Sequence, residues 1–233
     1  MLLPSFAADI TAYTEDWAPY NYAEGAAVKG ISTDILREAC ALARRLCEIH
    51  LVPWARAYKM ASSTPNALAF TMARTPKREK EFLWIGPITQ RTTWVYIRSD
   101  KASSFPNLKR LANARVGVVR YEASERDLIS AGVPDSAFVH ASSNAELLKM
   151  SARDMIDAMV DTEVGMAWNL RTAGLKPSAF VRAMKLSDEG AYYFAMNSDS
   201  DSALVHDLQV AIATLKRTGK SKAIVNQYLD GAK

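Results

Sequence analysis

The sequence predicts an α/β protein with two sheets, because strand and helix signals alternate from one end of the chain to the other. The alternation falls into two sets, and the second set begins near Thr92. Each set has the order strand–helix–strand–helix–strand, which implies two parallel sheets covered by helices. Two more helices close the chain, and sequence order alone does not say which sheet they cover.

The first set opens with a strand, which is followed by a long polar and aromatic loop. Ser32 or Thr33 can cap the next helix, whose apolar residues recur at helical spacing. Thr75 and Pro76 supply a capping residue and a proline at the first helical position, and so predict a short helix that ends before Trp84. The expected strands cover residues 9–14, 49–54 and 67–73, and a further short helix covers 56–62.

The second set continues the same alternation. Ser143 and Glu146 form a capping box that starts one of its helices. The first of the two closing helices places five apolar residues on one face: Leu204, Leu208, Ala211, Ile212 and Leu215. The expected strands cover residues 94–97, 116–119, 138–140, 158–160, 181–186 and 192–196.

The composition is that of an ordinary folded protein. Of the 233 residues, 49% are hydrophobic and 23% are charged, so the chain can bury a sizeable core. The net charge is +4 and the pI is about 9.0, but basic and acidic residues are interleaved, as in residues 77–81. The sequence has no basic stripe of the kind that binds nucleic acid. No apolar run approaches the roughly 20 residues that span a bilayer.

The N-terminus indicates export. Residues 1–8 are apolar and are followed abruptly by polar residues, and Ser5-Phe6-Ala7 has the small-x-small form of a signal-peptidase site. We interpret residues 1–7 as the remnant of a signal peptide removed on secretion. The alternative is an ordinary apolar first strand.

The chain has two cysteines, Cys40 and Cys47. On one straight helix they would lie about two turns, roughly 10 Å, apart, which is too far for a disulfide. If the helix ends near Arg45 and Cys47 opens the next strand, the chain reverses and the two cysteines can meet. Two cysteines close in sequence in an exported chain favour a disulfide.

The motifs of common enzyme classes are absent, since the chain has no G-x-S-x-G, H-E-x-x-H, P-loop or G-x-G-x-x-G. His50, His140 and His206 are far apart in sequence, which favours core or surface roles over catalysis. A metal at Cys40 and Cys47 would need further soft ligands nearby. We therefore expect no catalytic residue, no metal and no cofactor.

Polar and aromatic residues follow the predicted strands of the first set. Trp17 lies after the first strand, Trp54 ends the second, and Thr71 and Ala73 end the third. Arg78 lies in the predicted helix just beyond. Because open α/β sheets bind ligands outside the carboxyl ends of their strands, this repeated pattern indicates a binding site.

Over nearly the whole chain these features resemble the periplasmic solute-binding proteins of ABC transporters, polar-amino-acid type (bacterial extracellular solute-binding proteins, family 3). The family opens with an aromatic-x-Pro-aromatic turn and a Gly-aliphatic-x-x-Asp helix, which read here Trp17-Ala18-Pro19-Tyr20 and Gly30-Ile31-Ser32-Thr33-Asp34. Its Thr-x-x-Arg signature, aromatic residue and hinge-side proline read Thr75-Pro76-Lys77-Arg78, Phe82 and Gly86-Pro87. Some members also have a Cys-x6-Cys disulfide, which matches Cys40 and Cys47.

The resemblance implies a two-lobed periplasmic-binding-protein fold of class II with two hinge crossings. Lobe 1 is expected over residues 8–89 and 190–233, and lobe 2 over 90–189. The implied function is capture of a small polar, carboxylate-bearing solute, an amino acid or a relative, in a cleft between the lobes. A monomer in the periplasm would close on the solute and deliver it to a membrane ABC permease, without enzymatic activity.

For lobe 1, the resemblance assigns the ligand's carboxylate to Arg78. A planar guanidinium can form two parallel charge-assisted bonds with a carboxylate, which lysine cannot. Thr71 and Ala73 match strand-end positions that contact the same ligand. Trp17 and Trp54 match two positions that flank the ligand, and two facing indoles would favour a flat or cationic group.

For lobe 2, the sequence departs from the family. The family's Gly-Thr/Ser-Thr turn is replaced by Arg120-Tyr121-Glu122-Ala123-Ser124, so Arg120 and Tyr121 become the candidates there. The position of the family's aspartate for the ligand's ammonium group is Thr162, flanked by Asp161 and Glu163. Only half of the amino-acid clamp is matched, and either neighbouring carboxylate could restore the rest.

Two other functions are compatible with this fold. Some relatives of the family are cyclohexadienyl dehydratases, and a lyase of this kind would draw its acid–base groups from Glu122, Asp161, Glu163 or His140. Turnover of prephenate or arogenate distinguishes this alternative from a binding protein. The other function is the input domain of a sensor, which would normally accompany a transmembrane helix and a signalling segment.

Overall fold

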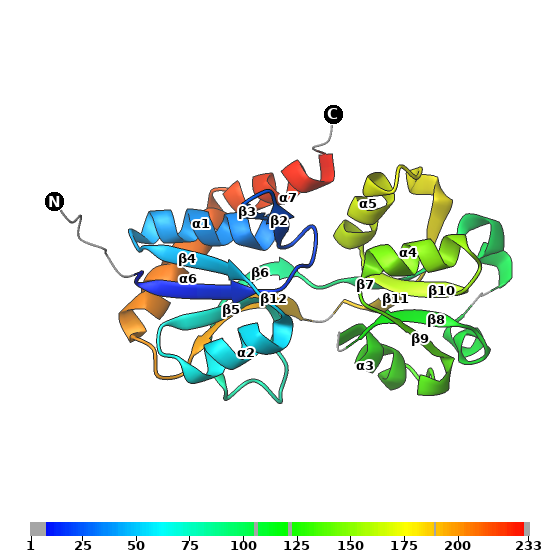
Figure 1. Cartoon of the computed structure of the whole chain (residues 1–233), viewed down its shortest axis with the longest axis horizontal. Coiled ribbons are helices and arrows are strands. Elements are labelled where there is room, and N and C mark those ends of the chain that lie inside the picture. Colours follow the sequence, from blue (N-terminus) through cyan, green and yellow to red (C-terminus); the bar gives the residue numbers. More distant parts are fainter. Residues whose placement is uncertain (1–7, 105–106, 121–122, 189, 231–233) are drawn as a thin grey trace. The chain divides into compact units, whose positions relative to one another are not determined.

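The computed structural model describes residues 8–104, 107–120, 123–188 and 190–230. The signal-peptide remnant predicted at residues 1–7 therefore lies outside the described residues. The chain forms two units, which we call lobe 1 (through Gln90, and again from Ala191) and lobe 2 (Arg91–Gly190). Figure 1 shows the elements of each lobe. The chain crosses between the lobes twice, as in the class II periplasmic-binding-protein fold.

The sheet of lobe 1 has the strand order β4-β1-β5-β12-β6. Its strands are β1 (Ile10–Thr14), β4 (Cys47–Leu51), β5 (Ala67–Ala73), β6 (Phe82–Gln90) and β12 (Ala191–Asn197). The first three are parallel, but β12 is antiparallel to both β5 and β6. The prediction of a purely parallel sheet is wrong here, because β12 enters from the second lobe crossing and not through a crossover helix.

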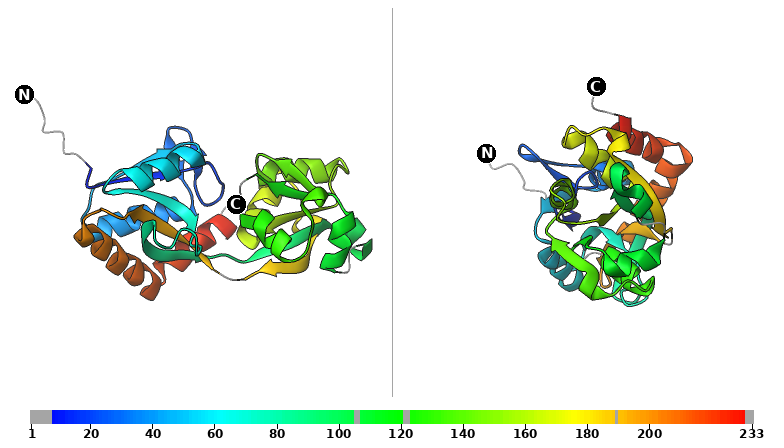
Figure 2. Two further views of the ribbon diagram at one scale, coloured as in Figure 1. Left: turned by 90° about the horizontal axis from the view of Figure 1, so that it is seen from below. Right: turned by 90° about the vertical axis from the view of Figure 1, so that its right-hand side faces the viewer.

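Four helices and a hairpin complete lobe 1. They are β2 (Tyr22–Glu24), β3 (Ala27–Lys29), α1 (Ile31–Ala43), α2 (Trp54–Ser63), α6 (Ser202–Arg217) and α7 (Lys220–Asp230). Helix α2 packs on β1 and β5, and α6 packs on α1 and β6 (Figures 1 and 2). The five apolar residues predicted for one face of α6 are all buried. Helix α6 thus covers the sheet of lobe 1, and α7 packs on α1 and α6.

The sheet of lobe 2 has the order β11-β7-β10-β8-β9 and is also mixed, since β7 is antiparallel to β10 and β11. Its strands are β7 (Thr93–Arg98), β8 (Val116–Val119), β9 (Phe138–Ala141), β10 (Ala158–Thr162) and β11 (Phe180–Ser187). Its α-helices are α3 (Ala123–Ser130), α4 (Asn144–Ala152) and α5 (Glu163–Thr172). Short 3-10 segments cover Ser99–Ser104, Leu108–Asn113, Asp135–Ala137 and Pro177–Ala179. The predicted cap of α4 is confirmed: Ser143 Oγ accepts the N–H of Glu146.

Helix α1 begins differently from the sequence prediction. Neither Ser32 nor Thr33 is the cap, because the helix starts at Ile31 and both side chains are fully buried in its first turn. The N–H groups of Ile31 and Ser32 donate to the carbonyl oxygens of Pro19 and Tyr20, at 2.9 Å each. Main-chain acceptors from the aromatic loop therefore replace a side-chain cap.

Strand β6 was not predicted, because Gly86-Pro87 interrupts its aromatic and apolar run. It forms at the edge of the sheet, and its pairing with β12 is irregular between Ile85 and Thr89, a position where a strand tolerates proline. The side chain of Gln209 on α6 bonds the main chain at the interruption, accepting from Gly86 N at 2.9 Å and donating to Gly86 O at 3.1 Å. The glycine has φ of 143°, which other residues rarely adopt.

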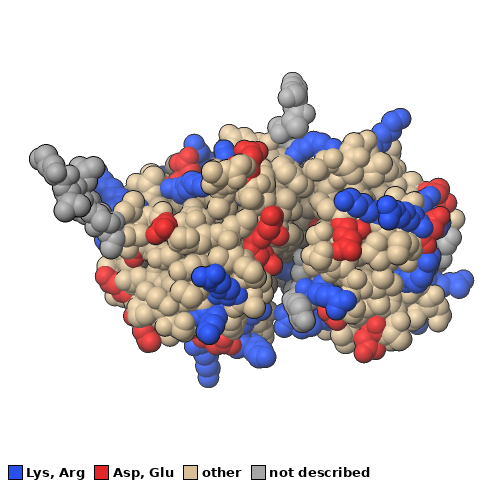
Figure 3. Space-filling model, viewed as in Figure 1, with Lys and Arg blue, Asp and Glu red and all other residues tan. Residues whose placement is uncertain are grey.

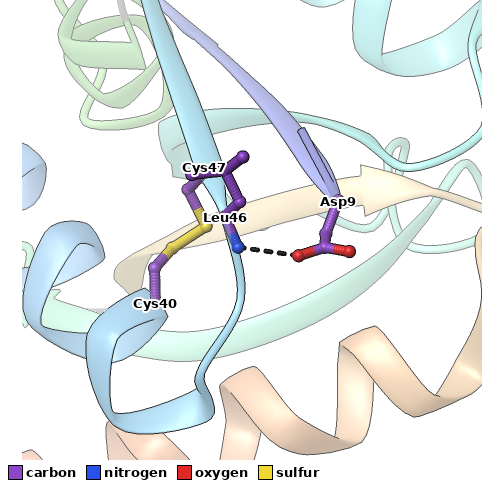
Figure 4. Close-up of a disulfide and its surroundings, with 4 residues drawn as sticks. All are labelled: Asp9, Cys40, Leu46 and Cys47. Atoms are coloured by element: carbon purple, nitrogen blue, oxygen red, sulfur yellow. Dashed lines mark hydrogen bonds between the residues drawn. A yellow bond between two sulfur atoms is a disulfide. The ribbon is translucent and has the colours of Figure 1, made fainter. Parts of the chain in front are cut away.

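The disulfide between Cys40 and Cys47 is confirmed, with a Cα–Cα distance of 6.2 Å. Helix α1 ends at Ala43, Arg44 adopts the left-handed conformation (φ 53°), and Cys47 opens β4. The main-chain N–H of Leu46 donates to Asp9 Oδ2 at 2.7 Å, which ties the reversal to the start of β1 (Figure 4). The reversed arrangement, and not the straight helix, is therefore the one formed.

Candidate binding edge of lobe 1

The carboxyl ends of β1, β4 and β5 lie at one edge of the lobe 1 sheet, because the three strands are parallel neighbours. We call this the binding edge. Its described connections are the loop 15–21 after β1, residues 52–54 after β4 and residues 74–81 after β5. The candidate residues predicted for lobe 1 all lie on these three connections or at the end of β5.

Thr71 holds the loop 15–21 in place. It is buried and has a φ of 61°, at an irregularity in the pairing of β5 with β12. Its hydroxyl donates to Asn21 Oδ1, and Asn21 Nδ2 donates to the carbonyl oxygen of Glu15 at 2.5 Å. Thr71 thus fixes the main chain that carries Glu15 and Trp17, and its predicted contact with the ligand stays a prediction.

Arg78 lies in a turn and not in the predicted helix. Residues 76–81 form consecutive turns, in which Arg78 N donates to Thr75 O at 2.9 Å and Glu81 N to Arg78 O at 3.0 Å. Only eight residues separate β5 from β6, and this connection closes with turns instead of a helix. Arg78 Nη1 donates to the carbonyl oxygen of Ala73 at 3.4 Å, which places the guanidinium beside the end of β5.

Two aromatic rings hold the Arg78 guanidinium. Its Cζ atom lies 5.9 Å from the ring centroid of Trp54 and 5.5 Å from that of Tyr58. The Tyr58 hydroxyl donates to Glu81, and burial followed by this bond raises the pKa of Tyr58. Cation–π attraction of this kind restricts the rotation of a guanidinium.

The two predicted tryptophans belong to different aromatic groups. Trp17 contacts Tyr20 and Tyr192, with ring centroids 4.8 and 5.2 Å away. Trp54 is the first residue of α2, not the last of a strand, and contacts Tyr58 at 6.3 Å. Among the ring contacts of the described residues, none joins Trp17 to Trp54, so a single indole sandwich stays a prediction.

Three residues of this edge escaped the sequence prediction. Tyr58 contacts Arg78, and its spacing of four residues from Trp54 on one helix was the available signal. Arg74 forks onto Glu79, with Nε 2.8 Å from Oε2. Its Cζ also lies 5.7 Å from the Trp84 ring and 5.5 Å from the Tyr193 ring, which fixes the turn that carries Arg78. Glu15, discussed below, is the third.

In lobe 2, Asp161 is buried, and its carboxylate accepts hydrogen bonds from residues of the same lobe. Its carboxylate accepts from Thr162 N at 2.7 Å, Asn169 Nδ2 at 3.0 Å and Asn144 Nδ2 at 3.3 Å. Burial raises the pKa of Asp161 to about 7, against the lowering effect of these donors. Gly165 leaves the necessary room, since a Cβ there would lie 2.3 Å from Asp161 Oδ1. The side chain ties β10 to α4 and α5.

The other lobe 2 candidates are placed as follows. Thr162 caps α5, and its Oγ1 accepts from Gly165 N at 3.0 Å. Glu163 is exposed and pairs with Arg182 at 2.6 Å. Arg120 is exposed at the end of β8, where its N–H donates to Ala141 O at 3.2 Å. Tyr121 lies outside the described residues, as does Glu122.

The described groups that the lyase alternative would use each have a partner within lobe 2. His140 Nε2 lies 3.1 Å from Glu125 Oε1, while Asp161 and Glu163 are engaged as described above. Among the residues that the structure describes, no group of three or more His, Cys, Asp or Glu side chains could hold a metal ion. On the face shown in Figure 3, described basic and acidic residues are interspersed.

Two lobes of this topology, with a charged and aromatic edge at the carboxyl ends of parallel strands, define a solute-binding protein of the periplasmic type. The profile of the bacterial extracellular solute-binding proteins, family 3, matches residues 10–231. The chain belongs to this family, whose members are extracytoplasmic, and it has a solute-binding role. The family membership favours a binding protein over an enzyme.

Solved structures share the fold at low sequence identity. A histidine kinase sensor domain with similarity to periplasmic binding proteins is 20% identical, with a TM-score of 0.80 over 94% of this chain and 95% of that one. An amino acid ABC transporter substrate-binding protein from Streptococcus pneumoniae, bound to L-arginine, is 16% identical (TM-score 0.79; 95% and 93%). The GluR0 ligand-binding core from Nostoc punctiforme, in complex with L-glutamate, is 14% identical (TM-score 0.79; 95% and 99%).

No curated protein matches the chain. In the part of the chain that the structure describes, none of the helices is both long and apolar enough to span a membrane.

Proposed function

We propose that the chain captures a small carboxylate-bearing solute of the amino-acid class at the binding edge of lobe 1 and delivers it to an ABC permease. Family membership and the fold shared with structures bound to L-arginine and L-glutamate support this class of solute. We further propose that the protein acts as a monomer in the periplasm, after removal of its signal peptide.

The observation that carries the proposal is the placement of Arg78. The guanidinium is held against two rings and one carbonyl oxygen at the end of β5, so its orientation is set before a solute arrives. Preorganised donors lose less conformational entropy on binding and match the planar geometry of a carboxylate. We assign the solute's carboxylate to this group and a flanking contact to Trp17.

Trp54 has a different role in this proposal. Because its ring faces the Arg78 guanidinium, it supports that group and borders the solute's carboxylate. The main chain at Thr71 and Ala73 completes the contacts of lobe 1. For lobe 2 we propose that Arg120, exposed at the end of β8, supplies a second positive group.

Calorimetry on Arg78 variants tests the assignment. Once a screen of amino and organic acids has given a binder, Arg78→Ala and Arg78→Lys should each weaken it by about 2–5 kcal/mol, the usual cost of breaking a desolvated charge pair. Arg56→Lys, an exposed arginine on the same lobe, is the matched control and should bind as the parent does. Unchanged affinity in both Arg78 variants would assign the carboxylate to another residue.

The histidine kinase sensor domain among the similar structures supports a second function, the input domain of a sensor. Both functions require solute binding, so they differ in what the chain is attached to. Immunoblotting of cell fractions separates them: a transport protein appears in the periplasmic fraction, and a sensor appears in the membrane fraction as one chain with a signalling domain.

A further inference from the structure

Lobe 1 contains a carboxylate with no partner on the described chain. Glu15 directly follows β1, at the binding edge, and its side chain is half-buried. Among the described residues, none donates a hydrogen bond to this carboxylate or forms an ion pair with it. Asp161 is the instructive contrast, since it is also withdrawn from water but has three donors around it.

The surroundings of Glu15 favour a positively charged group beside its carboxylate. Burial, and then the neighbouring charge of Asp16, raise the pKa of Glu15 to about 7. A carboxylate that has lost part of its water without gaining donors is less favourable in its charged form, and a cation placed beside it offsets that cost. The Glu15 carboxylate is therefore suited to bind a protonated nitrogen of a solute, rather than to form a contact within the unliganded protein.

The main chain at Glu15 is fixed as firmly as that at Arg78. Its carbonyl oxygen accepts from Asn21, which is itself held by Thr71. Trp17 N donates to Asn21 O at 2.6 Å, so the whole loop is closed on itself. The main chain that carries the Glu15 side chain is therefore held relative to the end of β5.

Lobe 2 does not present the carboxylate that the family uses for an ammonium group. Thr162 occupies that position and caps α5. Asp161 is buried among its own donors, and Glu163 is exposed and paired with Arg182. Both neighbouring carboxylates therefore already have partners within lobe 2.

We propose that Glu15 binds the protonated nitrogen of the solute, so that lobe 1 offers a partner to each of the two charges of an amino acid. The solute's carboxylate lies at Arg78, after β5, and its ammonium group at Glu15, after the adjacent parallel strand β1. Neighbouring strands are only about 4.8 Å apart, so the two groups share one short stretch of the edge. This inference rests on the proposed function and narrows the solute to a zwitterion.

The experiment compares matched solutes on matched variants of the full chain. The twenty common L-amino acids are screened by calorimetry at pH 8, and the tightest binder is paired with its de-amino acid, in which hydrogen replaces the ammonium group. Both are titrated into the parent, Glu15→Gln and the control Glu24→Gln, an exposed glutamate of the same lobe. Asp161→Asn and Glu163→Gln test the rival positions in lobe 2.

We expect Glu15→Gln to weaken the amino acid at least about 30-fold, the effect of removing one partner of a desolvated charge pair. Binding of the de-amino acid should change less than about threefold, and Glu24→Gln should change neither. An equal loss for both solutes, or a selective loss in Asp161→Asn or Glu163→Gln instead, would overturn the inference. A tight binder without a nitrogen would also overturn it while leaving the carboxylate function standing. Absence of any small-molecule binding would instead refute the function itself.

Discussion

At the scale of single residues, the carboxylates of Glu15 and Asp161 have different surroundings. Glu15 lacks donors on the described chain, whereas Asp161 has three, and burial raises the pKa of both to about 7. A carboxyl whose pKa is raised on folding binds protons more tightly in the native state than in the unfolded one. Its contribution therefore destabilises the fold as the pH rises from the unfolded value toward 7.

Asp161 gives a prediction about stability against pH. Between about pH 4 and 7 its contribution to the free energy of unfolding should fall by up to about 1.4 kcal/mol per pH unit. Asp161→Asn should remove this slope, since an amide keeps an acceptor for Thr162 and does not titrate. Urea unfolding of parent and variant at several pH values measures the difference. Parallel pH profiles for the two proteins would show that Asp161 does not titrate in this range.

At the scale of elements, the approach of the aromatic loop to the start of α1 decides the shape of the binding edge. Gly30 has a φ of 128°, and a Cβ there would lie 2.3 Å from the carbonyl oxygen of Tyr20. Tyr228 on α7 accepts the Gly30 N–H at 2.9 Å and donates to Asp34, which ties the last helix to the same point. The loop that carries Trp17 thus depends on one glycine.

Gly30→Ala should lower the free energy of unfolding by at least about 1–3 kcal/mol, because the backbone conformation and the close approach both disfavour a side chain. Gly25→Ala is the matched control: its φ is also positive, at 61°, but nothing lies within 4 Å of a Cβ there. The control should cost about 1–2 kcal/mol, the ordinary left-handed penalty. Chemical denaturation measures both, and equal losses would mean that the contact with Tyr20 O carries no energy.

Elements with a strong periodic pattern could be predicted from sequence, and the reason lies in burial. The five buried residues of α6 and the cap at Ser143 agree with the prediction because local spacing determines them. Strand β6 and the turn at Arg78 could not be predicted, because they depend on tertiary structure. The position of β6 at the sheet edge and the short distance that residues 74–81 must span are set by how the strands pair. The partners of Arg78 and Asp161 come from other elements, so residue types alone could not identify them.

At the scale of the whole molecule, lobe 1 is built from two distant parts of the chain. Strand β12 lies between β5 and β6, so the sheet formed by the first 90 residues has a gap where the returning chain belongs. Lobe 2 is continuous, and the two crossings run together where Arg91 N donates to Gly190 O at 3.2 Å. The lobes should therefore differ in whether they fold alone.

A fragment of residues 91–190 should fold by itself, whereas a fragment of residues 8–90 should not. The second fragment lacks the buried Phe194 and Met196 of β12 and the five buried residues of α6. At about 1.5–3 kcal/mol for each large apolar side chain, this loss is as large as the 5–15 kcal/mol that stabilises a typical domain. Dispersed amide NMR signals and cooperative thermal unfolding are expected for 91–190 only. Adding a peptide of residues 191–233 to the 8–90 fragment should restore its dispersion, and a cooperative transition in 8–90 without that peptide would contradict the argument.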